Sequence, residues 1–329
     1  MLKSMRQFQV GKATITVINI GDIHLPLAQY MNIPESEQQH YGLSQQSRAP
    51  IHNIHIQLPD TSILIDAGVY DVETETVYAL PDYTPPPSLI EQLASIGIQP
   101  DNIEHVIITH RHWDHINGTT CEKDGVYVPQ FPNATYYLGQ QDWERSESNR
   151  NDPHEVEYRT LRILNEHNVL IQIEETRAIG NHVRIIPAPG ETRGHQIVRL
   201  ESEGEVLFCL GDLYHHPIEF LNREWMVSWA RPETTLSSRD MLLKDALDSD
   251  ADPAQGGMTA TTTLESGDKD PTLDAGIYQP ASLGDYVWED LNGNGIQDDG
   301  DTGVEGVTVN LKDESGAVIE TTTTGPDGS

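Results

Sequence analysis

The 329-residue sequence predicts an α/β domain with antiparallel strand pairs, followed by a partial all-β module. Strand-like and helix-like segments alternate through residues 1–250, whereas residues 283–329 contain strand-like segments separated by Gly- and Asp-rich turns. The composition also changes near residue 251, because all 14 histidines lie before it. We therefore divide the chain into a domain over 1–250, an acidic Thr/Gly/Pro-rich linker or repeat remnant over 251–282, and an incomplete β-module over 283–329.

Strands are expected where β-branched residues gather, or where short apolar runs lie between turn residues. In the first domain they cover 14–18, 54–58, 63–66, 106–108, 134–138, 183–186, 197–200 and 206–210. The second and third of these flank Pro59-Asp60, which predicts a hairpin. Helices are expected over 155–166, over 235–247, and over 85–97 with prolines in the first turn and Gly97 at the end. Strands of the β-module are expected over 286–288, 307–311 and 317–323.

The net charge of −32 excludes several classes of function. Such an acidic chain repels phosphate backbones, so we expect no nucleic-acid partner and no docking on an anionic membrane. The sequence has no apolar run long enough to span a membrane, and its start has no apolar signal-peptide segment, which favours the cytoplasm. Cys121 and Cys209 are too few for a disulfide framework.

The main functional signal is a histidine cluster, Thr109-His110-Arg111-His112-Trp113-Asp114-His115, directly after the apolar run 106–108. A strand that ends there presents these side chains at the edge of a sheet, where sites are usually built. Imidazole and carboxylate groups bind zinc and similar divalent metals, and the segment offers ligands for two adjacent ions. The sequence therefore predicts a metal centre.

This segment resembles the THxHxDH motif of the metallo-β-lactamase fold hydrolases. Three further segments are similar to that family at the expected intervals: Pro187-Ala-Pro-Gly-Glu-Thr-Arg-Gly-His195, Leu210-Gly-Asp212, and Ile63-Leu-Ile-Asp66-Ala-Gly68. The resemblance covers about residues 8–250 and is greatest to the lactonase and organophosphate-hydrolase-like branch. It implies an αββα sandwich with a dinuclear site on one edge.

The resemblance also implies a role for each matching residue. The first metal takes His110, His112 and His195, the second takes Asp114 and His115, and Asp212 bridges them. Asp66 supports the metal loop. Zinc is the expected metal, with manganese, iron or cobalt as alternatives. A metal-bridged hydroxide would then attack an ester, lactone or related small-molecule substrate, with Asp114 orienting it or relaying its proton.

The sequence departs from the family in several places. The family places one more histidine near the end of the domain, but no histidine follows His216 here, which leaves the second metal short of one ligand. The presence of the last strand is also left open. Glu191 stands where this branch often has histidine, and Tyr214 comes one residue earlier than the family's pocket tyrosine. We expect Tyr214 and His215 to line the pocket rather than to replace the missing ligand.

The tail contains a calcium-loop pattern. Its ligand positions are Asp290, Asn292, Asn294, Ile296 through its carbonyl, Asp298 and Asp301. The surrounding residues resemble the B-type repeat of serine-aspartate-repeat bacterial surface proteins, in which calcium-stabilised modules form stalks. This favours a secreted or cell-surface location, whereas the start of the chain favours the cytoplasm. Half a module joined to a hydrolase suggests a gene fragment, a fusion or an assembly error.

We predict a metal-dependent hydrolase. One alternative is a catalytically impaired fragment fused to a calcium-binding surface stalk. A second alternative, within enzymes, is thioester hydrolysis, or persulfide oxidation, of which the latter uses a single metal held by two histidines and one aspartate. The oligomeric state and the substrate are not visible in the sequence.

Overall fold

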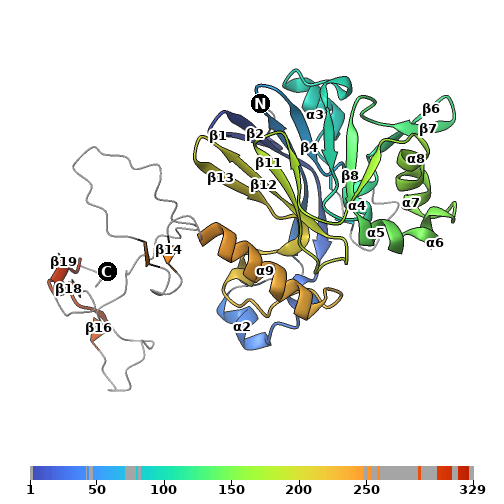
Figure 1. Cartoon of the computed structure of the whole chain (residues 1–329). Helices are drawn as coiled ribbons and strands as arrows, with labels where there is room; N and C mark the ends of the chain where they lie inside the picture. The colour runs from blue at the N-terminus through green and yellow to red at the C-terminus, as the bar shows by residue number, and fades with distance from the viewer. Residues whose placement is uncertain are drawn as a thin grey trace. The chain divides into compact units, whose positions relative to one another are not determined.

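The computed structural model describes residues 3–41, 43, 47–70, 79–80, 83–247, 251–252, 258–259, 288–289, 302–312 and 318–325. The chain forms two compact units, Met1–Asp274 and Ala275–Ser329. In the first unit two sheets pack face to face, and helices cover the outer side of each sheet (Figure 1). This is the expected αββα sandwich.

The larger sheet has seven strands in the order β1-β2-β3-β4-β5-β8-β9. Their bounds are β1 Met5–Val10, β2 Ala13–Leu25, β3 Ser47–Gln57, β4 Ser62–Ile65, β5 His105–Ile107, β8 Thr135–Gly139 and β9 Leu170–Ile173. Neighbours from β1 to β4 pair antiparallel, and neighbours from β4 to β9 pair parallel. The carboxyl ends of β4, β5 and β8 therefore meet at one edge, where α/β proteins usually build their sites.

The smaller sheet has four strands in the order β10-β11-β12-β13, all antiparallel. Their bounds are β10 Arg177–Ile179, β11 Val183–Pro187, β12 Gln196–Ser202 and β13 Glu205–Cys209. A separate hairpin joins β6 Thr120–Lys123 to β7 Val126–Pro129.

Alternating side chains of the strands supply the two sides of each sheet. Ile63 and Ile65 of β4 pack between the sheets, whereas Leu64 packs under the outer helices. In β12, Val198 packs between the sheets and Ile197 packs against α9. Both sheets are therefore buried on both faces, as the continuous apolar runs in the sequence indicate.

The helices are short apart from the last. They are α1 Leu27–Tyr30, α2 Glu35–His40, α3 Leu89–Ser95, α4 Trp113–Ile116, α5 Gln140–Arg145, α6 Glu147–Arg150, α7 Val156–Arg159, α8 Leu161–Glu166 and α9 Pro232–Leu247, with 3₁₀ turns η2 Pro100–Asn102, η3 Gly211–Leu213 and η4 Pro217–Phe220. None of the helices in the described part of the chain has the length and apolar character that crossing a bilayer demands.

Two helix predictions need correction. The prolines at 85–87 precede α3 instead of forming its first turn, because Ser88 caps the helix in a reciprocal capping box with Glu91. The helix expected over 155–166 breaks at Thr160, whose φ of −115° and ψ of −88° separate α7 from α8.

Short strands follow the helices. They are β14 Ala251–Asp252 and β15 Met258–Thr259, which pair with each other, and in the second unit β16 Trp288–Glu289, β17 Thr302–Gly303, β18 Thr308–Lys312 and β19 Val318–Thr323. The last two strands pair antiparallel, in agreement with the strands predicted over 307–311 and 317–323. The six predicted calcium ligands lie outside the described residues.

Candidate metal centre

The histidine loop runs from the end of β5 into α4 and lies against the end of β4. The N–H of Ala67 donates to the carbonyl of His115 at 3.1 Å. Gly68 permits this approach, because a Cβ at that position would lie 1.8 Å from the carbonyl oxygen of Asp114. The loop is therefore held by backbone contacts as well as by side chains.

Asp66 is the main side-chain support of this loop. It has a left-handed φ of 59°, and its carboxylate accepts hydrogen bonds from the Thr109 N–H at 2.7 Å and the Thr109 hydroxyl. Its Oδ2 also lies 2.8 Å from Nδ1 of His115. When Nδ1 of His115 donates to this carboxylate, Nε2 of the same ring is left as a metal donor.

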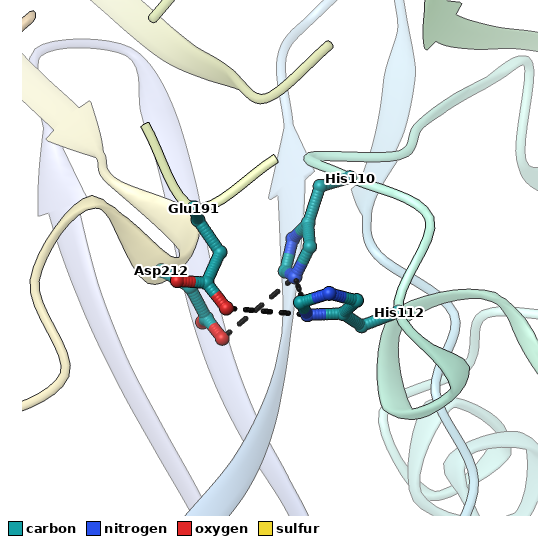
Figure 2. Close-up of side chains that lie close together, drawn as sticks. All are labelled: His110, His112, Glu191 and Asp212. Carbon is teal, nitrogen blue, oxygen red and sulfur yellow. Dashed lines mark hydrogen bonds and ion pairs between the residues drawn. The ribbon is translucent and has the colours of Figure 1, made fainter. Parts of the chain in front are cut away.

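Four donor atoms converge on one point at the sheet edge, as Figure 2 shows. His110 and His112 come from the loop after β5, Glu191 comes from the loop between β11 and β12, and Asp212 follows β13. Nε2 of His110 lies 2.9 Å from Nδ1 of His112 and 3.8 Å from Oδ2 of Asp212. Oε1 of Glu191 lies 3.2 Å from Nδ1 of His112. All four donor atoms lie within 4.8 Å of one another.

A second group of donors surrounds the same oxygen of Asp212. Nε2 of His115 lies 3.5 Å from Oδ2 of Asp212 and 3.6 Å from Oδ2 of Asp114. Nε2 of His215 also lies 3.5 Å from Oδ2 of Asp212, and 3.5 Å from Oε2 of Glu191. Asp212 is therefore the member common to both groups.

His195 lies beside these groups and is fully buried. Its Nδ1 lies 3.0 Å from the carbonyl oxygen of Ala188, and its Nε2 accepts a hydrogen bond from the Asp212 N–H at 3.1 Å. Its ring centroid is 5.3 Å from that of His110. The structure thus places Glu191, not His195, among the four mutually close donors.

Asp142 joins the two loops that carry these histidines. Its buried carboxylate accepts hydrogen bonds from the N–H of Arg111 at 3.0 Å, the hydroxyl of Thr192 at 2.7 Å and the N–H of Gly194 at 2.8 Å. Gly194 packs directly on Gly139, where an added Cβ would lie 1.9 Å from the Gly194 carbonyl oxygen. The β8–α5 corner and the His195 loop are therefore in direct backbone contact.

A buried ion pair holds the segment that carries His215. Oε1 of Glu219 accepts hydrogen bonds from the N–H groups of His215 at 2.5 Å and His216 at 2.8 Å. Arg239 of α9 pairs with the other oxygen of Glu219 and also donates to the carbonyl oxygen of Leu213 at 2.9 Å. His216 is directed elsewhere, because its Nδ1 accepts a hydrogen bond from the Ile218 N–H at 3.2 Å.

Tyr214 is turned toward the ion pair. It stacks on Phe220 with ring centroids 4.0 Å apart, and the Arg239 guanidinium lies 4.2 Å from its ring centroid. Tyr214 and His215 both line a cleft of about 490 Å³ beside the metal donors.

Burial and opposite charges divide the histidines into two classes. Burial lowers the pKa of His110 and His195, so both rings are neutral, which is the form that binds metals. Burial also acts on His115, but the carboxylates of Asp114, Asp212 and Asp66 raise its pKa well above the usual value. The pKa of His215 is likewise raised well above its usual value, against burial, by Asp212 and Glu191.

Comparisons with known proteins agree with the fold and the motifs. Residues 53–224, more than half of the chain, match the family model of the metallo-beta-lactamase superfamily. The chain belongs to this superfamily. Residues 281–329 match the model of the SdrD B-like domain.

Solved structures with the same fold include a probable metal-dependent hydrolase from Staphylococcus aureus, at 20% identity and a TM-score of 0.62 over 73% of this chain and 87% of that one. Others are AidC, a dizinc quorum-quenching lactonase (18%, TM-score 0.59, 74% and 87%), and the hydrolase AbOPH (20%, TM-score 0.61, 75% and 88%). At these low sequence identities, the similar structures establish the fold of this chain and nothing further.

The curated relatives are serine-aspartate repeat-containing proteins. Serine-aspartate repeat-containing protein D of Staphylococcus aureus (strain Newman) is 52% identical over 73 residues, which are 22% of this chain and 6% of that protein. Serine-aspartate repeat-containing protein F of Staphylococcus epidermidis (strain ATCC 12228 / FDA PCI 1200) is 29% identical over 267 residues, or 79% of this chain and 14% of that protein. The chain thus spans a small part of these relatives' length.

The structure brings together most of the residues that the sequence singled out. His110, His112, Asp114, His115, Asp212 and His215 form or adjoin the two donor groups, and Asp66 lies directly behind them. The donor role of Glu191 and the linking role of Asp142 were missed. The only sequence signal for the donor role of Glu191 was a Glu where this branch often has histidine, and nothing in the sequence indicated the role of Asp142.

Proposed function

We propose that this chain is a metal-dependent hydrolase that cleaves an ester or lactone with two divalent ions. The observation that carries the proposal is the pair of donor groups that share Oδ2 of Asp212. Lactonase neighbours of the same fold, one of them described as dizinc, support the substrate class and favour zinc. Manganese, iron and cobalt are accepted by the same kinds of donor.

The donor residues fit divalent ions. Donor atoms bound at about 2.1 Å around a tetrahedral ion lie about 3.4 Å apart. The separations of 2.9 Å, 3.2 Å and 3.8 Å in the first group and of 3.5 Å and 3.6 Å in the second lie near that value. In addition, Oε2 of Glu191 and Nε2 of His215 are buried without a hydrogen-bond partner among the described residues, a costly state that a bound cation would relieve.

His215 is a candidate for the metal ligand that this sequence lacks relative to the family. The second metal lacks the family's last histidine, and Nε2 of His215 lies as close to Asp212 as Nε2 of His115 does, at 3.5 Å each. We propose that His215 supplies this ligand, which revises the expectation from the sequence that it only lines the pocket. Glu191 then joins His110 and His112 at the first metal, and His195 would become a ligand only if its Nε2 released the Asp212 N–H.

The remaining steps belong to the protein's own groups. When bound, two divalent ions make water a nucleophile at neutral pH and polarise the substrate's carbonyl oxygen. Asp114 lines the cleft of about 690 Å³ over the centre, and burial raises its pKa. Its carboxylate can therefore take the proton of the attacking water and deliver it to the leaving oxygen. The Trp229 side chain, which donates to Oε1 of Glu191 at 2.6 Å, forms part of the cleft wall.

The test is the number of transition-metal ions bound per chain, measured by elemental mass spectrometry on desalted protein. We expect about two ions in the native chain and about one in His215→Ala. His216→Ala is the matched control and should retain the native number, because Nδ1 of this neighbouring histidine caps η4, whereas Nε2 of His215 lies beside Asp212. Equal metal content in native protein and His215→Ala would remove His215 from the ligand set.

A substrate screen tests the reaction class. Lactone, aryl ester, thioester and phosphotriester substrates should be compared with and without added metal. Metal-dependent turnover of the lactone or aryl ester supports the proposal. No turnover of any of the four by metal-loaded protein would contradict it and favour an impaired hydrolase attached to a surface module, the alternative that the SdrD B-like match supports.

A further inference from the structure

Three arginines gather at the rim of the cleft above the candidate metal centre. Arg145 ends α5, Arg193 lies two residues before His195, and Arg231 directly precedes α9. All three are exposed, and all three line the cleft of about 690 Å³. Three separate segments thus place a guanidinium group at one opening.

These arginines have no partners among the described residues. None of the three side chains forms a hydrogen bond or an ion pair there. Arg111 in the same cleft shows the contrast, because its Nη1 lies 2.8 Å from Oε1 of Glu157. The positive charge at the rim is therefore not neutralised by a neighbouring carboxylate.

The acidic groups of the cleft are already engaged. Asp142 accepts three hydrogen bonds, and Asp114, Glu191 and Asp212 belong to the donor groups of the metal centre. Glu191, Asp114 and Asp212 each lie beside a histidine of the metal centre.

Such a cluster is unexpected in this chain. The sequence has 20 Lys and Arg residues against 52 Asp and Glu residues, so unpaired cations are scarce. The charges of Arg231 and Arg145 lower the pKa of Arg193, as expected for a positive group beside two others. A fold gains nothing from bringing like charges together, whereas a binding site for an anion does.

We propose that Arg145, Arg193 and Arg231 form a subsite for an anionic group of the substrate, a carboxylate or a phosphate, at the end remote from the cleaved bond. The planar guanidinium forks suit the paired oxygens of these groups. This inference rests on the proposed hydrolase function, because it places the anion in the same cleft as the metal donors. It narrows the substrate from esters in general to acidic esters.

The test compares matched esters that differ only at the remote end. Mono(4-nitrophenyl) adipate carries a carboxylate where 4-nitrophenyl hexanoate carries a methyl group, and a third ester ends in a phosphonate. We expect kcat/KM to be about tenfold higher for the better acidic ester than for the hexanoate at low salt, and the advantage to shrink in high salt. The ratio of the two acidic esters separates a carboxylate site from a phosphate site.

Variants assign the preference to the rim. Arg193→Gln with Arg231→Gln should bring the ratio of acidic to neutral ester close to unity, with little effect on the hexanoate. Arg184→Gln is the matched control, because Arg184 is an exposed arginine of β11 that does not line this cleft. A native ratio of unity, or a preference that survives in the double variant, would overturn the subsite.

A binding measurement keeps the subsite testable if no ester is hydrolysed. Monomethyl adipate is titrated into the metal-loaded chain and followed by tryptophan fluorescence, since Trp229 lines the cleft, with dimethyl adipate as the neutral control. Saturable binding of the acid alone, lost in the double variant, supports the subsite even where the hydrolase proposal fails. Equal responses to both compounds would refute it.

Discussion

Replacing Arg239 by methionine should destabilise the first unit strongly. Arg239 is 1% exposed and Glu219, its partner, is 0% exposed, so the pair is buried among the segments behind the metal centre. Methionine keeps much of the volume but removes the charge and every hydrogen bond of the guanidinium group. It leaves the Glu219 carboxylate buried without its counter-ion.

The magnitude follows from the contacts that are lost. Besides the ion pair, the guanidinium donates to the carbonyl oxygens of Leu213 at 2.9 Å, Arg223 at 2.9 Å and Trp225 at 2.8 Å. Removing one partner of a buried pair costs about 3–5 kcal/mol of the free energy of unfolding, since an uncompensated charge remains. For a domain of this size that corresponds to a fall of about 10 °C in Tm.

The assay is thermal unfolding followed by tryptophan fluorescence at fixed metal concentration. Arg223→Gln is the control, because its ion pair with Asp240 is 54% exposed on both sides and should contribute about 0–1 kcal/mol. Glu219→Met combined with Arg239→Met should recover part of the loss, because it removes the buried carboxylate that the single variant leaves without a counter-ion. Equal Tm values for Arg239→Met and Arg223→Gln would refute the reasoning.

Three further predictions concern other parts of the chain. Burial lowers the pKa of His55 from 6.5 to about 4, so the unfolded chain binds more protons than the folded chain between these two pH values. The free energy of unfolding therefore falls as the pH falls from 7 to 4, and His55→Gln should remove about 3 kcal/mol of that loss, measured by denaturant titrations at pH 7 and pH 4. An equal loss in the native protein and the variant would contradict the prediction. Asp142→Asn should weaken metal binding by about tenfold or more, because an amide cannot accept all three hydrogen bonds that the carboxylate accepts. The affinity is measured by competition with a chelator. Unchanged affinity would show that other contacts hold the loops that carry Arg111 and Gly194. The tail should bind calcium, which is measured as terbium luminescence sensitised through Trp288 and quenched when calcium displaces the terbium. Asp290→Ala combined with Asp298→Ala should abolish this luminescence. Luminescence that persists in the double variant would refute the predicted calcium loop.

Much of the fold could be predicted because its strands have strong local signals. The apolar run 106–108 and the β-branched run 14–18 correspond to β5 and β2, and the hairpin around Pro59-Asp60 joins β3 to β4. Short continuous apolar runs between turn residues are typical of strands buried on both faces of a sheet, so they predict strands without knowledge of the neighbouring strands. The histidine loop was recognisable for a similar reason, since its ligands lie within six residues.

Other parts depend on contacts between distant segments. Asp142 acts through Arg111 and Gly194, which are 31 and 52 residues away along the chain, so no local pattern reveals it. The position of His215 depends on Glu219 and on Arg239 of α9, which hold its backbone beside Asp212. The break at Thr160 is another feature without a local signal in the sequence.

The contact between Gly139 and Gly194 has a consequence for how this protein can change its substrate. Any side chain at either position would force the β8–α5 corner away from the His195 loop, since a Cβ on Gly194 would lie 2.4 Å from the backbone nitrogen of Asp142. Substitutions at these two positions are therefore not tolerated, and the distance between the two loops cannot change gradually. The exposed rim has no such restriction, because the side chains of Arg145, Arg193 and Arg231 form no hydrogen bond or ion pair with the described residues. Random libraries selected for new substrates should accumulate changes at the rim and leave both glycines intact.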